Sequence, residues 1–418
     1  MKFQKKLTEM KIRKSAVIGM ALIGGVAFIA PSCKKGCTDP NADNYNAEAK
    51  KDDPDNPCTY TVNPWTEVTY EGTVYNQLTG TITENLTLDA ASNWLISGGV
   101  FVASGVTLTI EEGTTVNTAD DGTVPFLSVS QGGMINACGT ASAPIVFTPV
   151  SATPAAGDWG GIILNGYAPI NTGATAEGEG GTGTYGGTDA ADNSGTLCYV
   201  RVEYAGKLLS TDNELNGFSF NGVGSATTLH HLQAYRGNDD GFEFFGGTAN
   251  LEYAVSTGNG DDSFDWTHGW SGTGTNWIVE QDPTSGDRGI EADNNGSNNA
   301  ATPMSSPSIS KMTITGRGIS AGKDAVKLRE GTAGTLDNFM ISEAQDAIDI
   351  QHDVTAANVT AGTLTVTNVS TSNVTNDWKV SATVGTDSTN AATMGTTAVN
   401  GNGTGADSGW TTGWTKAL

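Results

Sequence analysis

Asn238-Asp239-Asp240-Gly241-Phe242-Glu243-Phe244-Phe245-Gly246-Gly247 is the stretch from which the fold can be worked out. Its centre is a short figure: an Asn, Asp or Arg, then a small residue, then two apolar residues that flank one polar position. Copies of this figure begin at Asn216, Asp240, Asp262, Arg288, Asp324 and Asp346. The start positions are 22 to 26 residues apart, with one interval of 36. A short period that carries alternating apolar residues is typical of a β-solenoid, whose units cannot bury an apolar face alone.

The polar position of each copy is predicted to point out of the coil, because its two apolar neighbours point inward. The outward residues are, in order, Ser219, Glu243, Asp265, Glu291, Lys327 and Asp349. Two carboxylates one coil apart repel each other by roughly 1 kcal/mol in water and by more at a partly buried surface. We therefore expect the three consecutive acids to be balanced by a divalent cation, by water, or by the basic residues Arg236, Arg288 and Lys327.

The composition agrees with an all-β solenoid. The chain of 418 residues contains 55 Gly and has no long stretch with the spacing of an amphipathic helix. Its formal charge is −24, and such a surface repels phosphate groups and attracts divalent cations. Nucleic-acid binding is therefore not expected. Nucleotide binding is not expected either, because no Gly-rich phosphate loop leads from a strand into a helix.

Residues 1–32 are interpreted as a lipoprotein signal peptide. Basic residues precede the apolar run 16–30, which is shorter than the about twenty residues that span a bilayer. The run ends in Pro31-Ser32-Cys33. This ending resembles a bacterial lipobox, and the resemblance implies that Cys33 is lipidated and becomes the mature N-terminus. A plain secretory signal cut near Ala30 is the alternative. Lipidation would place the protein at the outer membrane, on the cell surface or the periplasmic face.

Residues 33–60 are predicted to form a small acidic spacer module. They include Cys37-Thr38-Asp39-Pro40, Asn44-Tyr45-Asn46 and Cys58. This pattern resembles a short motif that is common in exported Bacteroidetes proteins. The resemblance implies a Cys37–Cys58 disulfide, in agreement with an oxidising compartment. The alternating oxygen-bearing residues after Cys37 leave a weak calcium site open, but a stapled spacer is favoured.

Residues 61–376 are expected to form the β-helix, and residues 377–418, which lose the repeat, a C-terminal cap or tail. Trp410 and Trp414 could lie over the last coil. Motifs at 159–161, 199–206, 214–217, 239–247 and 261–266 occur in an order that resembles the uncharacterised right-handed β-helix lipoproteins of Bacteroidetes and relatives. The resemblance implies an all-β, right-handed parallel β-helix and an exported protein, but no known chemistry.

Two long stretches interrupt the repeat. The Gly-, Thr- and Ala-rich segment 173–195 and the Asn-rich segment 292–307 are predicted to be loops that leave a coil and return to it. Loops of this kind on a rigid scaffold are either binding elements or spacers. The cysteines Cys138 and Cys198 lie in apolar strands and are expected to be two buried thiols, with a disulfide between nearby coils as the alternative.

Calcium is the predicted counter-ion of the acidic ladder. The candidate ligands are hard carboxylate oxygens, and they come from Asp239, Asp240, Glu243, Asp261, Asp262, Asp265 and Glu291. The nearby Trp266, Trp270 and Trp277 are candidates for a sugar-stacking face, although interior packing is the commoner use of tryptophan.

Two classes of function compete. The favoured one is an outer-membrane-anchored lipoprotein with a non-catalytic binding or envelope-structural role, with a glycan or a protein as its partner. The alternative is a calcium-dependent polysaccharide lyase or glycoside hydrolase that acts on acidic glycans. Its catalytic residues would be Asp240, Asp262, Asp265 and Arg288. Hydrolases of this fold pair Asp residues with a His-Gly and a basic pair, but here His268 follows the Asp pair too closely.

Overall fold

The computed structural model describes residues 34–40, 42, 44–59, 64–211 and 213–418. The predicted signal peptide and its lipidation site, Cys33, lie outside the described residues. The chain divides into two compact units, Met1–Asn63 and Pro64–Leu418. Among the described residues, no helix is long and apolar enough to cross a membrane.

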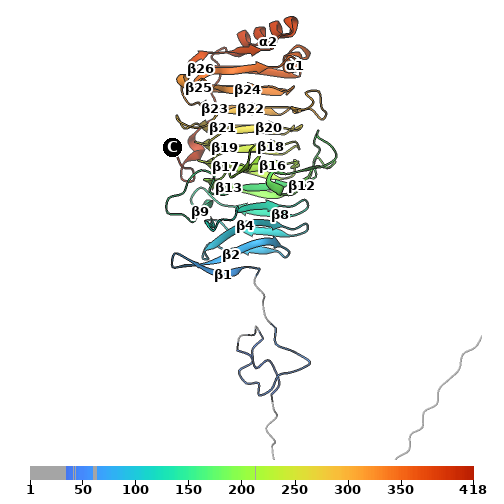
Figure 1. Ribbon diagram of the computed structural model, residues 1–418, viewed down its shortest axis with the longest axis vertical. Helices are drawn as coiled ribbons and strands as arrows, with labels where there is room; N and C mark the ends of the chain where they lie inside the picture. Colours follow the sequence, from blue (N-terminus) through green and yellow to red (C-terminus); the bar gives the residue numbers. More distant parts are fainter. Residues whose placement is uncertain (1–33, 41, 43, 60–63, 212) are drawn as a thin grey trace, which may run out of the picture. The chain divides into compact units, whose positions relative to one another are not determined.

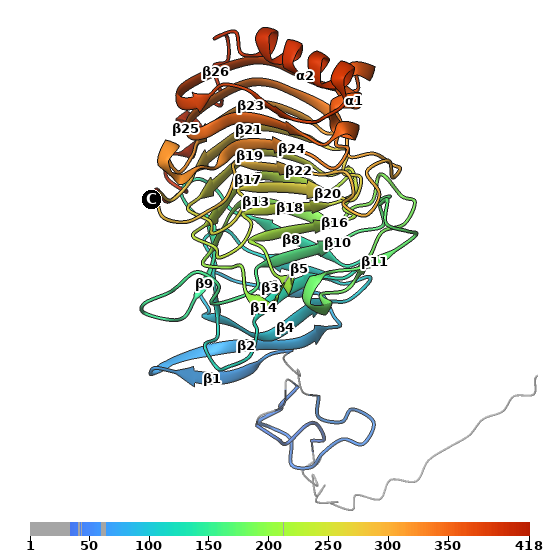
Figure 2. The same cartoon turned by 45° about the horizontal axis from the view of Figure 1, so that its top comes forward.

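The second unit is a parallel β-helix. Twenty-three of its described strands form one continuous sheet, which is wound into stacked coils with three faces (Figure 1, Figure 2). Face A carries the repeated figure, and its strands are β7 (Phe126–Val129), β10 (Ile162–Asn165), β16 (Phe218–Asn221), β18 (Phe242–Phe245), β20 (Phe264–Thr267), β22 (Ile290–Ala292), β24 (Asp324–Leu328) and β27 (Lys379–Ser381). The fold class expected from the repeat is thereby confirmed.

Faces B and C complete each coil. In the first coils they are separate strands, with β3 (Leu86–Leu88), β5 (Thr107–Ile110) and β8 (Met134–Cys138) on face B and β6 (Thr115–Thr118) and β9 (Ile145–Pro149) on face C. In the later coils one long strand crosses both faces, and these strands are β13 (Gly195–Glu203), β17 (Thr228–Tyr235), β19 (Asn250–Thr257), β21 (Thr273–Glu280), β23 (Ser308–Thr315), β25 (Gly334–Gln351) and β26 (Leu364–Asn376). The last part of β25 also continues into face A, where it pairs with β24 and β27.

The corner between faces B and C is made by one residue per coil in the left-handed region. This column includes Tyr199, His231 and Tyr253, with φ angles of 50°, 54° and 57°. A positive φ is uncommon for residues other than Gly, but here it bends the strand sharply without interrupting the pairing of neighbouring coils. The side chains at this corner consequently stack above one another on the outside of the coil.

The ends of the β-helix differ from its middle. At the start, β1 (Thr66–Tyr70) pairs antiparallel with β2 (Thr73–Ile82), and β2 pairs in parallel with β4 (Trp94–Val102). Near the other end, α1 (Asp353–Ala361) replaces the turn between faces A and B, and α2 (Gly385–Ala398) lies over the last coil (Figure 1). Two small antiparallel pairs lie in loops, β11 (Ala176–Glu177) with β12 (Thr184–Tyr185) and β14 (Leu208–Ser210) with β15 (Asn213–Glu214). Single 3-10 turns occur at Glu179–Gly181, Ile319–Ala321 and Gly409–Thr411.

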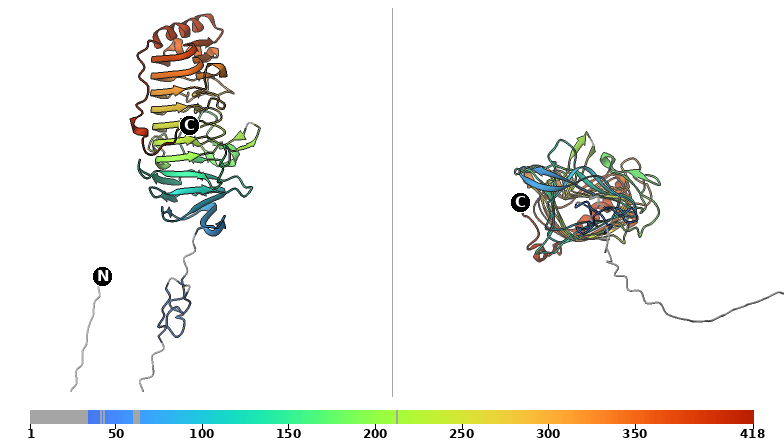
Figure 3. Two further views of the ribbon diagram at one scale, coloured as in Figure 1. Left: turned by 90° about the vertical axis from the view of Figure 1, so that its left-hand side faces the viewer. Right: turned by 90° about the horizontal axis from the view of Figure 1, so that it is seen from below.

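The C-terminal cap therefore differs from the expectation for Trp410 and Trp414. The last coil is covered by α2, whose Ala391 and Ala398 are buried. The following segment, residues 399–418, runs back along the outside of the coils (Figure 3), and we call it the C-terminal strap. Trp410 and Trp414 contact Tyr253 and Tyr199, far from the last coil. Placing these two tryptophans over the last coil was wrong because the chain turns back after α2.

The interior is filled by columns of apolar side chains, as the repeat predicts. Phe242 pairs with Phe264 in register, and their ring centroids are 4.9 Å apart and nearly parallel. Phe264 in turn stacks on Trp277 at 4.1 Å. Because each ring covers the one in the next coil, these residues are withdrawn from water along the whole stack.

Cys138 and Cys198 form a disulfide. They are register partners on β8 and β13, and their Cα atoms are 4.5 Å apart. The expectation of two buried thiols was therefore wrong, and the alternative of a bond between neighbouring coils is correct. The chain between them completes one coil through β9 and β10, and the parallel register of β8 and β13 places the two cysteines opposite each other.

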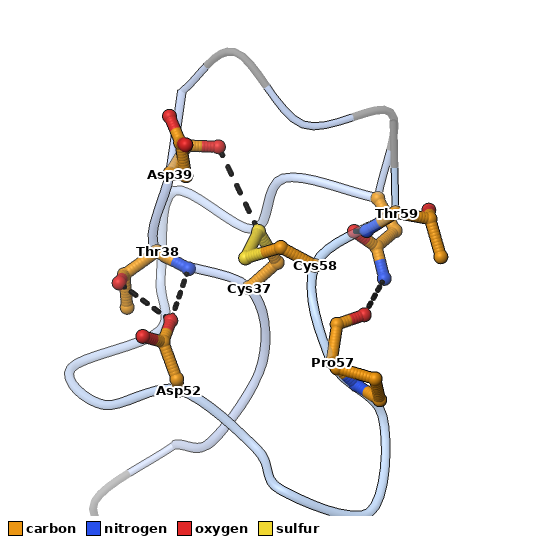
Figure 4. The surroundings of a disulfide bond; sticks show 8 residues. Cys37, Thr38, Asp39, Asp52, Pro57, Cys58 and Thr59 are labelled. Carbon is orange, nitrogen blue, oxygen red and sulfur yellow. Dashed lines mark hydrogen bonds between the residues drawn. A yellow bond between two sulfur atoms is a disulfide. The ribbon is translucent and has the colours of Figure 1, made fainter. Parts of the chain in front are cut away.

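The described part of the first unit, within residues 34–59, is a small irregular module held by a disulfide (Figure 4). Cys37 and Cys58 are bonded, with Cα atoms 4.8 Å apart, which confirms the predicted pair. Asp52 accepts hydrogen bonds from the backbone N–H and the hydroxyl of Thr38, at 2.9 and 2.6 Å. These contacts close the module without a hydrophobic core of any size, which is the usual reason for a disulfide in a short segment.

Candidate functional site

The acidic ladder on face A is present in the predicted register. Glu243 lies beside Asp265 on β18 and β20, and Asp265 beside Glu291 on β20 and β22. Lys327 follows Glu291, and Asp349 follows Lys327. The two apolar residues of each copy point inward, and the polar residue between them points to the outside of the coil.

A second row of acids lies in the turns that lead into face A. Asp240 accepts a hydrogen bond from the backbone N–H of Asp262 at 2.8 Å, and Asp262 accepts one from the backbone N–H of Arg288 at 2.5 Å. Each carboxylate thus satisfies a backbone donor of the next coil, which explains the preference for Asp or Asn at this position. The other carboxylate oxygen of Asp262 lies 3.8 Å from the Arg288 guanidinium.

The two rows bring carboxylates very close together. Among the residues that the structure describes, four groups of three have one oxygen atom each within 4.8 Å of one another. They consist of Asp239, Asp240 and Asp261; Asp240, Glu243 and Asp265; Asp261, Asp262 and Asp287; and Asp262, Asp265 and Glu291. All seven predicted ligand residues occur in this set. Asp287 was not predicted, because it belongs to the turn rather than to the repeated figure.

The acidic residues are more buried than an outward-facing ladder suggests. Asp240 is 6% exposed, Asp262 3% and Glu291 8%. Part of the cover comes from the first predicted loop, whose Glu179 lies 3.5 Å from Asn216. The two predicted loops lie on the same side of the unit (Figure 2). Asn171, just before the first loop, donates a hydrogen bond to Asn294 in the second at 2.9 Å, and accepts one from Asn295 at 2.9 Å. The two loop regions are therefore joined next to the end of β20.

Basic residues balance the part of the ladder nearer the C-terminus. Arg288 contacts Glu291 at 2.6 Å and also pairs with Asp287 and Asp262. Further pairs join Arg329 to Glu291 and Asp293, Lys327 to Asp324 and Asp349, and Lys379 to Asp346. Two of the three predicted neutralising residues thus have this role. The third, Arg236, lies instead against Tyr235 and 4.0 Å from Asp282.

The part nearer the N-terminus has no such balance. Within the described ranges, no Lys or Arg forms an ion pair with Glu179, Asp239, Asp240, Glu243 or Asp265. Glu179 comes from the first loop and was not predicted, because nothing in a loop sequence indicates where the loop will lie. The uncompensated group formed by these five residues is hereafter called the acidic pocket.

Burial and mutual repulsion raise the pKa values in the acidic pocket. The pKa of Asp239 rises to about 8, mainly through burial and then through the charge of Asp261. The pKa of Glu179 rises to about 7, through burial and the charge of Glu214. Burial also raises the pKa of Asp240, Glu243 and Asp265 well above the usual range, with further contributions from neighbouring carboxylates. Taking such groups out of water disfavours their ionised form.

Two oxygen atoms at the acidic pocket have no hydrogen-bond partner. One is Oδ1 of Asp265 and the other is Oδ1 of Asn216, and both are buried. Asn216 is 1% exposed, and its Nδ2 donates to Glu243 at 2.5 Å. A buried oxygen without a donor is costly unless a water or an ion satisfies it. Asn216 occupies the first position of its copy of the repeat, so its place in the site could have been derived from the spacing.

The three candidate sugar-stacking tryptophans lie in the interior. Trp266, Trp270 and Trp277 are completely buried. Their indole N–H groups donate to the Thr332 hydroxyl and to the carbonyl oxygens of Ala249 and Leu251. A sugar-binding face built from them was therefore a wrong prediction. Alternation along β20 places Trp266 inward. Trp270 and Trp277 also lie inside the coil, where they stack on Phe244 and Phe264.

The candidate catalytic residues are close together, but the Arg288 guanidinium is already paired with three carboxylates. Although burial opposes it, the charges of Asp262 and Glu291 raise the pKa of the Arg288 guanidinium above its usual value. A cation held in this way is a poor proton acceptor. His268 lies beside Tyr185 and Phe245 instead of among the acids, and burial lowers its pKa to about 4.

Comparison with protein families gives a match over most of the chain. Residues 80–415 match the family described as the pectate-lyase-like β-helix domain. The chain belongs to this family. Neither the curated proteins nor the solved structures compared with the chain include a match. Membership in the pectate-lyase-like β-helix family agrees with the coil geometry and is compatible with both a binding role and catalysis, so the site itself has to distinguish them.

Proposed function

We propose that this member of the pectate-lyase-like β-helix family is an outer-membrane-anchored lipoprotein with a non-catalytic binding or envelope-structural role. A glycan or another protein would be its partner. In this proposal a calcium ion held in the acidic pocket stabilises the coils that form it. The observation that carries the proposed calcium site is a group of close, buried or half-buried carboxylates without a Lys or Arg ion-pair partner among the described residues, together with two oxygens that lack a hydrogen-bond partner.

The donor set fits calcium. Asp240, Glu243 and Asp265 supply carboxylate oxygens within 4.8 Å of one another, and Asn216 adds an amide oxygen without a partner. Calcium takes six to eight oxygen ligands in flexible geometry. Every residue of the close groups is Asp or Glu, whereas the transition metals favour nitrogen or sulfur ligands. A bound cation would allow these buried groups to ionise, which is otherwise expensive.

The geometry favours binding over catalysis. Glycoside hydrolases separate their two carboxyl groups by about 5 to 10 Å so that a sugar or a water fits between them. Here Asp240, Glu243 and Asp265 each have one carboxylate oxygen within 4.8 Å of the others, an arrangement that suits shared coordination of one cation. A lyase needs a free base, but Arg288 contacts three carboxylates. These contacts keep the Arg288 guanidinium charged, so Arg288 is not in a form that accepts a proton from a substrate.

The calcium part is tested by thermal unfolding of the protein in chelator and in millimolar calcium. An ion that binds only the folded state stabilises it by about 2.7 kcal/mol at a concentration one hundred times its Kd. The double variant Glu243→Gln/Asp265→Asn should lose this calcium-dependent increase in Tm. The matched control Asp324→Asn, whose carboxylate is paired with Lys327, should keep it. An identical Tm of the parent protein in chelator and in calcium would rule out the calcium site.

The role is tested by incubation with uronic-acid polysaccharides, with and without calcium. Retention of the polysaccharide without new products supports a binding role, and neither retention nor products supports the envelope-structural role. Unsaturated or reducing-end products that disappear in Asp262→Ala would overturn the non-catalytic proposal.

The anchor is tested separately by intact-mass analysis of the protein from its native membrane. The proposal requires an acylated N-terminus at Cys33. A mature chain that begins near residue 30 without lipid would contradict it, and protease treatment of whole cells would show which side of the membrane the protein faces.

A further inference from the structure

The C-terminal strap connects coils that are far apart in the β-helix. Near its start, Gly401 donates a hydrogen bond to Val369 on β26 at 3.0 Å. Thr404 then donates to Asn338 on β25 at 2.5 Å, and Ala406 to Thr313 on β23 at 3.0 Å. The strap ends beside β13 and β17, several coils below its start (Figure 3).

The end of the strap is held by polar contacts with face C. The backbone N–H of Lys416 donates to Oε1 of Gln233 at 2.8 Å, and Nε2 of Gln233 donates to the carbonyl oxygen of Lys416 at 2.6 Å. The Lys416 ammonium lies 2.8 Å from Glu203. Arg201 donates to the carbonyl oxygen of Trp414, which is completely buried. Reciprocal contacts of this kind indicate a specific docking site.

Between these anchors the strap covers a stack of three rings, Tyr199, His231 and Tyr253, which we call the corner stack. The His231 ring lies between the two tyrosines, with centroid distances of 4.3 and 4.5 Å. The rings of Trp410 and Trp414 have their centroids 5.6 and 5.9 Å from the centroid of the His231 ring. Both faces of the His231 ring are covered by the two tyrosines, and the strap tryptophans pack against its edge.

A second imidazole makes the corner stack sensitive to protonation. Nδ1 of His230 lies 2.9 Å from Nδ1 of His231, so a hydrogen bond between them requires one of the two nitrogens to carry no proton. Glu252 is the register partner of His230 on the next coil and favours a positive charge there. The other titratable groups against the pair are the two tyrosines of the corner stack, on β13 and β19. The strap contributes only the uncharged indoles, while its Lys416 pairs with Glu203.

We propose that the C-terminal strap is an acid-released clamp, docked on the corner stack while the His230–His231 pair is uncharged and detached when both imidazoles are protonated. Two adjacent imidazolium groups would repel each other and break the Nδ1 contact. The strap would then lose the uncharged ring edges against which its two tryptophans pack.

Docking gives the β-helix a connection that a solenoid otherwise lacks. In a stack of coils each unit contacts only its neighbours, so local opening does not spread far. The strap joins β26 and β25 to β17 and β13 directly, and it therefore resists separate opening of the coils between them. Its release would loosen this connection and expose the corner stack without unwinding the coils.

The direction of the pH effect follows from the environment of the pair. Burial lowers the pKa of His230, and burial together with the charge of His230 lowers the pKa of His231 to about 4. A detached pair would titrate at about 6.5, the usual value. The docked form therefore binds fewer protons, and its advantage is complete above about pH 6.5 and is lost as the pH falls toward 4.

The test is hydrogen exchange of the full chain, measured by mass spectrometry at several pH values and corrected for the intrinsic exchange rate. We expect peptides from residues 409–418 to lose protection by at least about tenfold between pH 7 and pH 4.5, while peptides from β20 keep theirs. In His231→Phe, which retains a flat ring but cannot titrate, this loss should shrink to less than about twofold. His352→Gln, a histidine substitution far from the strap, should behave like the parent.

A second variant covers the case in which His231→Phe does not dock at any pH. His230→Gln removes the partner imidazole and should also suppress the acid-dependent loss. An unchanged loss in His230→Gln, or full protection of the parent strap down to pH 4, would overturn the proposal.

Discussion

Phe264 shows at the scale of one residue how the interior is stabilised. Its side chain is completely buried and stacks on Phe242 and Trp277. Replacing it with Ala should lower the free energy of unfolding by about 3 to 5 kcal/mol, because it removes the buried ring and leaves a cavity. Urea denaturation measures this loss. The control is Leu208→Ala, since Leu208 is 55% exposed and its loss should change stability by less than about 0.5 kcal/mol. Equal midpoints for both variants would contradict the interior register.

The acidic pocket leads to a second prediction at the residue scale. Because the pKa values of Glu179 and Asp239 are raised to about 7 and about 8, folding favours their protonated forms. Without divalent ions, their contribution to stability is full below about pH 4 and is lost as the pH rises toward 8. Calcium binds the ionised forms, so the increase in Tm caused by calcium should grow from pH 5 to pH 8. A pH-independent calcium effect in differential scanning calorimetry would show that the ion binds elsewhere.

At the scale of elements, the disulfide between β8 and β13 connects two neighbouring coils. It joins cysteines 60 residues apart in sequence. Closing a loop of this length stabilises a fold by about 2 to 4 kcal/mol. The double variant Cys138→Ser/Cys198→Ser should therefore lower the Tm of the β-helix. The matched control Cys37→Ser/Cys58→Ser changes a disulfide in the other compact unit and should leave that Tm unchanged. Similar losses in both variants would mean that the two units unfold together.

At the scale of the whole molecule, α2 protects an open sheet end. Without it, the last coil would expose strand edges and apolar side chains that can pair with a second copy. Ala391→Asp places a charge on the buried side of α2, and we expect concentration-dependent association as the helix detaches. Ala392→Asp introduces the same change on the exposed side and should leave the protein monomeric. Light scattering at several concentrations compares the two variants. Association of both, or of neither, would contradict the capping role of α2.

The coil, its register and the identity of the outward ladder could be derived from the repeat. Alternation with period two sets which side of each strand faces inward, and a slip by one residue would bury Glu243 and expose Phe242 and Phe244, so only one register is possible. The first position of the copy was also informative in two coils, because the side chains of Asp240 and Asp262 accept a backbone N–H from the next coil. These features depend on residues that are close in sequence or one repeat apart.

The state of the acids and the position of the strap required the folded chain. Glu179 reaches Asn216 at 3.5 Å because a loop folds back over face A, and Arg329 reaches Asp293 across 36 residues of sequence. Lys416 meets Glu203 from 213 residues away. A repeat describes only what each coil does to its neighbours, whereas burial, charge balance and docking depend on segments that leave the coil and return. That is why the ladder could be recognised from the spacing. Which of its acids pair with Lys or Arg, and which belong to the acidic pocket, could not.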